Sequence, residues 1–176
     1  MNKKRIAIIG AGIGGMTTAV ALSQKGIDIS IFEQAPALSE VGAGLTVTPN
    51  ATKGLMYLNL GEEIAKIGMA HEKQGVRHYK TGDMIVPLHR GKKMLEQYGA
   101  YQFQLHRADI HDVLVNELKK NAPDSIYVNH QLSDIKESSE SVELKFTNGE
   151  KHEFDFVIGA DGNRSTVRNI ILGDDE

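Results

Sequence analysis

The chain has 176 residues, of which 40% are hydrophobic and 24% are charged, and its formal net charge at pH 7 is −3. This length predicts one domain or slightly more, and the composition is that of a soluble globular protein rather than a disordered or fibrous one. The slightly acidic balance, without a basic tract, disfavours nucleic-acid binding. The absence of Cys excludes disulfides, Cys-ligated zinc and thiol catalysis, and it agrees with a reducing, cytoplasmic location.

The amino-terminal segment has two interpretations. No residue from Ile6 to Gln24 is charged, basic residues precede this run, and Ala19-Val20-Ala21 resembles the cleavage site of a secretory signal peptide. The run is too short for a membrane span, which needs about 20 predominantly apolar residues. Its glycines weaken an apolar helix, whereas a dinucleotide-binding turn explains them by their positions. We therefore favour the turn and expect no membrane segment.

The first three elements form a predicted βαβ unit. Arg5–Ile9 is a short β-branched run typical of a buried strand. A helix is expected over Gly14–Lys25, ended by Gly26, and Ile27–Phe32 alternates apolar and polar residues like a second strand. A right-handed crossover then makes the two strands parallel neighbours.

The later elements mix helices with extended segments. We expect a glycine-rich irregular stretch over 35–49, then helices over 50–60 and 62–67 and a hairpin over 75–89 around Thr81-Gly82-Asp83. A helix over Arg107–Asn121 follows, and then extended antiparallel segments to Asp155 with a turn at Asn148-Gly149. The last predicted elements are a buried strand over 154–160 and a helix that starts near Ser165. Together these elements predict an α/β fold, in which a parallel sheet with helices carries an inserted antiparallel β patch.

The turn after the first strand fits the pattern G-x-G-x-x-G. Gly10 permits a tight turn, Gly12 lets the backbone approach a pyrophosphate, and Gly15 lets the helix pack closely on the strand. The amino terminus of the helix then offers unpaired N–H groups and a partial positive charge to phosphates. The pattern is informative here because it follows a strand and opens a helix.

An acidic residue completes this pattern. Glu33 ends the second strand, 18 residues after Gly15, where a carboxylate can accept hydrogen bonds from the hydroxyls of an adenosine ribose. The same carboxylate would repel a 2′-phosphate, which disfavours NADP at this position. The alternative is a solvated acid at a strand end beside a packing turn. On these residues alone, NAD and FAD both remain open.

Further segments carry a family resemblance. They are Phe32–Pro36, Val41–Leu45, Thr48–Ala51, Leu105–Asp109 and Phe156–Arg168. The last of these contains D-G-x-x-S-x-x-R, with Asp161, Ser165 and Arg168 in its slots. With the glycine turn, the chain resembles the single-component FAD-dependent aromatic-ring hydroxylases, closest to the salicylate-hydroxylase-like and tetracycline-oxidising branches. The resemblance implies a Rossmann-like FAD-binding domain over 1–176, with 70–104 as the start of an inserted substrate domain.

The resemblance also implies which residues hold FAD. The glycines at the pyrophosphate would be Gly10, Gly12, Gly14 and Gly15. Glu33 would hold the adenosine ribose, Arg107 the phosphate and ribityl region, and Asp161 the pyrophosphate. Gly44, with Leu45, would lie near the flavin, and Leu132 would give a main-chain contact to adenine. Two alternatives remain: Arg107 as an exposed helix-start residue beside Asp109, and Asp161 as a cap of the next helix through Ser165.

The histidines do not indicate a metal site. His106 and His111 are five residues apart, which is not the i, i+4 spacing of a zinc-binding helix, and the other histidines are scattered. We therefore expect no metal and interpret the histidines as surface or packing residues.

The implied activity is that of a flavoprotein monooxygenase. NADH or NADPH would reduce the flavin, and one atom of oxygen would enter an aromatic or related small molecule while the other leaves as water. We nominate no catalytic side chain: some relatives place a histidine after the ribose-binding acid, and 41–48 holds none. Tyr79 and Tyr101 are candidates for lining a ring pocket.

The family also has a later Gly-Asp segment, followed by Ala-Ala-His and Pro, that closes over the flavin. Residues 1–176 do not contain it, so we expect a shortened FAD-binding domain with an incomplete ring pocket. Two other functions remain open. One is a non-catalytic FAD-binding module, and the other is an NAD-dependent dehydrogenase, against which the Asp161 segment and Arg107 argue.

Overall fold

The computed structural model describes residues 4–38 and 43–173 and divides the chain into two compact units. The first unit comprises Met1–Glu40 and Leu114–Glu176, and the second comprises Val41–Val113. The boundary falls inside helix α5 (Arg107–Asn121), whose two halves are therefore assigned to different units.

A four-stranded parallel sheet organises the first unit, in the order β11-β1-β2-β7. Ile8 of the central strand lies opposite Ile158 of β11 and Ile31 of β2. Helix α1 (Ile13–Ser23) connects β1 to β2, so the predicted βαβ unit with parallel neighbours is confirmed. The strands are β1 (Arg5–Ile9), β2 (Asp28–Phe32), β7 (Ile126–Tyr127) and β11 (Phe156–Gly159).

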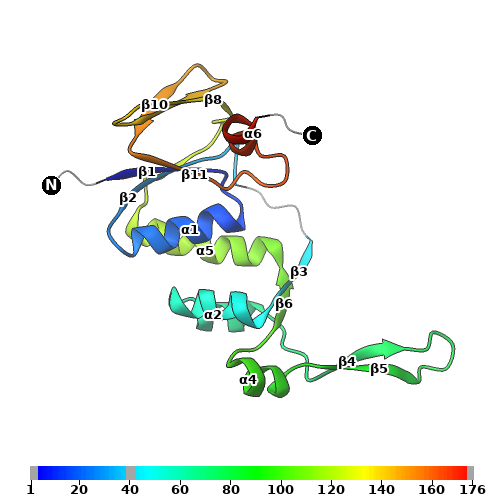
Figure 1. Ribbon diagram of the computed structural model, residues 1–176. Coiled ribbons are helices and arrows are strands. Elements are labelled where there is room, and N and C mark those ends of the chain that lie inside the picture. Colours follow the sequence, from blue (N-terminus) through cyan, green and yellow to red (C-terminus); the bar gives the residue numbers. More distant parts are fainter. Residues whose placement is uncertain (1–3, 39–42, 174–176) are drawn as a thin grey trace. The chain divides into compact units, whose positions relative to one another are not determined.

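Both faces of this sheet are covered (Figure 1). Helix α1 lies on one face, and a three-stranded antiparallel sheet of order β10-β9-β8 lies on the other, beside helix α6 (Thr166–Leu172). Burial on both sides explains why β1 is a continuous apolar run rather than an alternating one. The antiparallel strands are β8 (Leu132–Glu137), β9 (Val142–Phe146) and β10 (Lys151–Phe154).

A hydrophobic core fills the space between the two sheets. Its members are each less than one tenth exposed: Ala7, Ile9, Phe32, Leu132, Leu144, Phe146, Phe154 and Val167. Phe32 is the central aromatic residue, with ring centroids 4.6 Å from Phe146 and 5.1 Å from Tyr127. Because this core joins β1 and β2 to β8–β10, the residues that end β2 are held from both layers.

Over its described residues, 43–113, the second unit contains two small antiparallel sheets and three complete helices. Strand β3 (Gly44–Val47) pairs with β6 (Phe103–His106), and β4 (Lys73–Arg77) forms a hairpin with β5 (Met84–His89). The helices are α2 (Pro49–Tyr57), α3 (Gly61–Ile67) and α4 (Lys92–Tyr98). The hairpin was predicted from its turn, and the α/β class with small antiparallel sheets is confirmed.

Four local predictions were wrong or incomplete. The buried strand expected over 154–160 is divided, because Phe154 ends β10 and β11 begins at Phe156, which is 54% exposed. The stretch over 35–49, expected to be irregular, contains β3, whose partner β6 is remote in the sequence. Ile126–Tyr127, expected to be antiparallel, joins the parallel sheet beside β2. Helix α4 was not predicted. The proposed insertion over 70–104 lies within the second unit and stays a prediction. Among the described helices, none combines the length and apolar character that a membrane span requires.

Candidate cofactor-binding site

The glycine turn between β1 and α1 contains two positions that only glycine fits. Gly10 has a φ of +100°, and a Cβ there would lie 2.5 Å from the carbonyl oxygen of Ala160. A Cβ on Gly15 would overlap the carbonyl oxygen of Gly10. By contrast, a Cβ on Gly14 would have no neighbour within 4 Å. Gly10 and Gly15 are therefore required by the packing of the turn, and Gly14 leaves open space beside it.

The amino terminus of α1 has the properties of an anion site. Gly12 is the residue before the helix, and the first backbone bond of α1 runs from the Met16 N–H to the Gly12 carbonyl, 2.9 Å. Within residues 4–38 and 43–173, no side chain caps this end and its first turn holds no acidic residue. The N–H groups of the first turn and the positive end of the helix dipole thus suit a phosphate group.

The Glu33 carboxylate is hydrogen-bonded to the glycine turn and is not simply a solvated acid at a strand end. Its Oε2 accepts a hydrogen bond from the Ala11 N–H, and its Oε1 accepts one from the Ala35 N–H, both 2.9 Å. The main chain of Glu33 is also held, because its N–H donates to Tyr127 and its carbonyl accepts from His130, both at 2.8 Å. The half-buried carboxylate is therefore fixed beside the glycine turn.

A second loop reaches the same edge of the sheet. It follows β11, which is the parallel neighbour of β1, and the Ala160 N–H donates to Ile9 at 2.8 Å. A Cβ on Gly10 would come within 2.9 Å of the Cα of Asp161. The structure therefore brings Asp161 next to Gly10, as expected for the carboxyl ends of neighbouring parallel strands.

The spacing D-G-x-x-S-x-x-R has a local structural explanation. Asp161 Oδ1 accepts from the Ser165 hydroxyl at 2.5 Å, and Asp161 Oδ2 accepts from the Val167 N–H at 3.1 Å. Ser165 in turn accepts from the Arg168 N–H at 2.9 Å and is the amino-terminal cap of α6. The capping alternative for Asp161 is thus observed, and its contact with a cofactor stays a prediction.

Leu132 is buried at the start of β8, 5% exposed, and its side chain belongs to the core between the sheets. Its main-chain contact to adenine stays a prediction.

The remaining predicted site residues belong to the second unit. Gly44 lies opposite His106 in the β3–β6 ladder, and the Arg107 N–H donates to the Ala43 carbonyl at 2.9 Å. The ladder therefore brings Gly44 and the start of α5 together. Val41 and Gly42 of the same segment lie outside the described residues.

The two candidate ring-pocket residues, Tyr79 and Tyr101, differ in exposure. Tyr79 is 86% exposed after β4, in the turn of the hairpin, and Tyr101 is half-buried before β6. Neither is shown to line a ring pocket, and both stay candidates.

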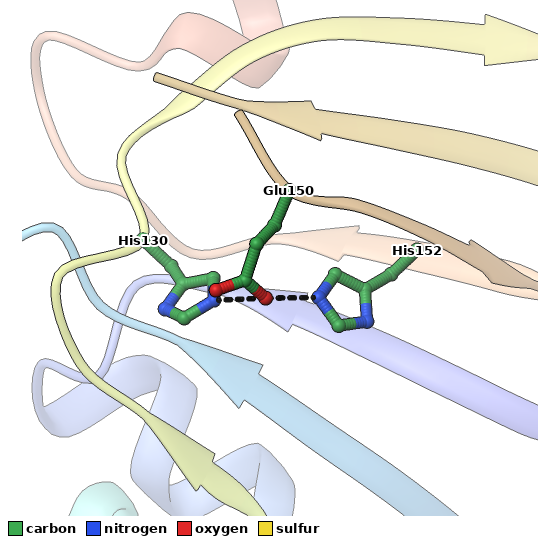
Figure 2. Close-up of side chains that lie close together, drawn as sticks. All are labelled: His130, Glu150 and His152. Atoms are coloured by element: carbon green, nitrogen blue, oxygen red, sulfur yellow. Dashed lines mark hydrogen bonds and ion pairs between the residues drawn. The ribbon is translucent and has the colours of Figure 1, made fainter. Parts of the chain in front are cut away.

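One cluster escaped the sequence analysis. The two histidines considered in the sequence analysis are not part of it: His106 is exposed and His111 is buried. The cluster consists of the side chains of His130, Glu150 and His152, which lie close together (Figure 2). Two of them, Glu150 and His152, are close in sequence, and this short spacing was the only available signal. His130 comes from a different segment, so the sequence could not show that it joins them.

Comparisons with known proteins agree with this geometry. A family model described as "FAD binding domain" matches residues 3–172. The chain is 35% identical over 170 residues to 6-hydroxynicotinate 3-monooxygenase of Pseudomonas fluorescens, covering 96% of this chain and 43% of the relative. It is 36% identical over 170 residues to 3-amino-4-hydroxybenzoate 2-monooxygenase of Streptomyces cremeus, covering 97% of this chain and 42% of the relative.

A solved structure also matches. Klebsiella pneumoniae HpxO in complex with FAD and uric acid superposes with a TM-score of 0.82 at 27% identity, covering 94% of this chain and 41% of that one. The chain thus spans less than half the length of these relatives. From the glycine turn, the acid at the end of β2 and the match over 3–172, the chain belongs to the FAD-binding family of flavoprotein monooxygenases.

Proposed function

We propose that this chain is the FAD-binding portion of a NAD(P)H-dependent flavoprotein monooxygenase that hydroxylates an aromatic or related small molecule. The observation that carries the proposal is the uncapped amino terminus of α1 with Glu33 fixed beside it. This pair of features suits a diphosphate next to an adenosine ribose. An anion-binding turn alone would not favour a dinucleotide over a simple phosphate.

Each part of the site would make a different contact. The diphosphate would lie against Gly10, Gly12, Gly14 and Gly15. Each carboxylate oxygen of Glu33 already accepts one backbone N–H and keeps a second lone pair, so the two oxygens can accept both ribose hydroxyls. Bound FAD supplies the redox chemistry, and the protein contributes binding, orientation and exclusion of water. Arg107, Gly44, Leu132 and Asp161 complete the proposed set.

The names of the relatives support a substrate class. Two are named for a hydroxynicotinate and an aminohydroxybenzoate, and HpxO is described in complex with uric acid. All three compounds are planar rings that carry oxygen substituents. We therefore propose a planar hydroxylated or oxo-substituted ring compound as the substrate, with NADH or NADPH as the reductant.

The first test is a titration of the purified chain with FAD, followed by absorbance and flavin fluorescence. We expect one FAD per chain, and about tenfold weaker binding for Glu33→Gln, since the loss of one charge-assisted hydrogen bond costs about 1.5 kcal/mol or more. Asp28→Asn is the matched control, because Asp28 is an exposed acid at the opposite end of the same strand. Equal loss of affinity in both variants would contradict the proposed role of Glu33.

The second test measures NADH and NADPH oxidation by the FAD-loaded chain, with and without hydroxybenzoates, hydroxynicotinates and urate. Substrate-stimulated oxidation with a hydroxylated product supports the full proposal. Binding of FAD with no oxidation identifies a binding module without turnover. Binding of NAD in place of FAD would instead favour a dehydrogenase and overturn the proposal.

A further inference from the structure

Two histidines and a glutamate converge at one edge of the first unit, apart from the glycine turn. His130 lies in the segment between β7 and β8, Glu150 directly precedes β10, and His152 lies within β10 (Figure 2). One oxygen of Glu150, Oε2, is 3.2 Å from His130 Nε2 and 3.0 Å from His152 Nε2. One ligand atom from each of the three residues lies within 4.8 Å of the others.

These separations fit the edges of a metal-coordination polyhedron. Bonds of about 2.0–2.1 Å from zinc to nitrogen and oxygen place tetrahedral ligands about 3.3 Å apart. The two histidine–carboxylate distances already have this size. The ligand atoms of the two histidines lie within 4.8 Å of each other.

The hydrogen bonds around His130 orient it as a ligand. Its Nδ1 lies 2.6 Å from the Val128 carbonyl oxygen, and a carbonyl only accepts, so Nδ1 carries the hydrogen. In the neutral ring, Nε2 therefore presents a lone pair toward the Glu150 carboxylate. Two lone pairs that face each other require a positive charge between them, which a proton or a metal ion supplies. A histidine that donates its other ring N–H to a backbone carbonyl is the usual arrangement of a metal ligand.

Hydrogen bonds also orient the Glu150 side chain. The Asn148 side chain donates to Glu150 Oε1 at 3.4 Å, and the Glu150 N–H donates to Asn148 Oδ1 at 2.9 Å, which leaves Oε2 toward the histidines. The ionised carboxylate is the form of a glutamate that binds metal.

The cluster is buried against the core on one side and open to solvent on the other. His130 is 8% exposed, and its ring packs against Phe32 and Phe146, with centroids 5.4 and 5.1 Å away. Glu150 is exposed, so an ion can enter from solvent. An open side also leaves room for water at the remaining coordination position.

We propose that His130, Glu150 and His152 bind one divalent transition-metal ion of the zinc type, with water completing the coordination. Imidazole nitrogens select such ions, whereas Mg²⁺ prefers sites built from oxygen alone. This proposal departs from the sequence-based expectation of no metal. The proposal does not rest on the proposed FAD chemistry.

A bound ion would hold the segment before β8 and the start of β10 close to the end of β2. The His130 N–H donates to the Glu33 carbonyl, 2.8 Å, and the Asn129 N–H donates to the Ala35 carbonyl, 2.9 Å. The metal would thereby hold the segment before β8 and the start of β10 against the strand end that carries Glu33. Its role is structural, and no catalytic step is assigned to it.

The test is a Zn²⁺ titration of the metal-free, tag-free chain against a chromophoric chelator, with Mg²⁺ as the hard-cation control. We expect one Zn²⁺ per chain, a higher melting temperature with Zn²⁺, and no effect of Mg²⁺. Glu150→Gln and His152→Gln should each weaken Zn²⁺ binding more than about tenfold, because even the loss of a group that orients a ligand costs about 10- to 100-fold. His106→Gln is the matched control, since His106 is exposed and outside the cluster.

A second measurement keeps the test independent of the folding of any variant. In ¹⁵N spectra of the histidine side chains, Zn²⁺ should shift Nε2 of His130 and His152 and leave Nδ1 of His130 protonated. No Zn²⁺ binding, or binding that Glu150→Gln and His152→Gln leave unchanged, would overturn the proposal. Zn²⁺-induced shifts confined to other histidines would do the same.

Discussion

Strands β2 and β5 look alike in sequence and differ in environment. Both are short and mostly apolar, yet Ile31 and Phe32 in β2 are at most 1% exposed, whereas Ile85 and Val86 in β5 are 58% and 46% exposed. Strand β2 lies between two layers of the first unit, and β5 belongs to a two-stranded hairpin. Apolar composition therefore marks a strand, and the number of layers around that strand decides how much each side chain stabilises the fold.

The largest effect is expected at the centre of the buried strand. Phe32→Ala removes a ring that packs against Phe146, Phe154 and Tyr127. We expect a loss of about 3–5 kcal/mol in the free energy of unfolding, measured by urea denaturation, because removal of a buried ring loses its transfer free energy and leaves a cavity. Phe156→Ala is the matched control on the same sheet: Phe156 is 54% exposed, and its truncation should cost less than about 1 kcal/mol. Similar losses for both variants would refute the contrast.

The next effect is expected in the glycine turn. Gly15→Ala places a methyl group on the Gly10 carbonyl oxygen, a backbone atom that cannot move aside. We expect a loss of about 3 kcal/mol in the free energy of unfolding and much weaker FAD binding. Gly14→Ala is the control for folding, since its methyl group meets nothing within 4 Å. It should leave the apo-protein as stable or up to about 1 kcal/mol more stable. An unchanged melting temperature for Gly15→Ala would contradict the role given to its packing.

A smaller, pH-dependent effect is expected where β1 begins. The Arg5 N–H donates to Asp155 at 2.7 Å and the Lys4 ammonium donates at 2.6 Å, and these contacts lower the pKa of Asp155 below its ordinary value of 3.8. Because the folded-state pKa is the lower one, the stabilisation is complete above the ordinary value and is lost as the pH falls through the folded-state value. Asp155→Asn should therefore destabilise the protein at pH 6, and the difference from wild type should shrink at pH 3. A difference that is the same at both pH values would argue against this ion pair.

The smallest effect is expected in the exposed hairpin. Ile85→Ser replaces an apolar side chain that is more than half exposed, so the free energy of unfolding should change by no more than about 0.5 kcal/mol. Chemical denaturation of this variant beside Phe32→Ala measures the contrast between the two strands directly. A loss above 2 kcal/mol would mean that β5 is buried in solution.

Much of the candidate site followed from the sequence. The order of strand, glycine turn, helix and strand predicted that Glu33 would end β2, and the Ala11 and Ala35 N–H groups bind its carboxylate there. The D-G-x-x-S-x-x-R motif around Asp161 could also be recognised in the sequence, because the hydrogen bonds that cap α6 join residues a few positions apart. The roles of Gly44, Arg107 and Leu132 toward FAD rest on resemblance and are predictions still to be tested.

The sequence by itself determined the elements whose requirements are local: the βαβ unit, the turn in which a Cβ would collide with backbone, and the capped start of α6. Only the tertiary structure decided the pairing of β3 with β6, the place of β7 beside β2, and the meeting of His130 with Glu150 and His152. The physical reason is the sequence separation of the interacting residues. The hydrogen bonds of turns and helix caps join residues a few positions apart, whereas strand pairing and side-chain clusters join segments whose separation no local pattern encodes.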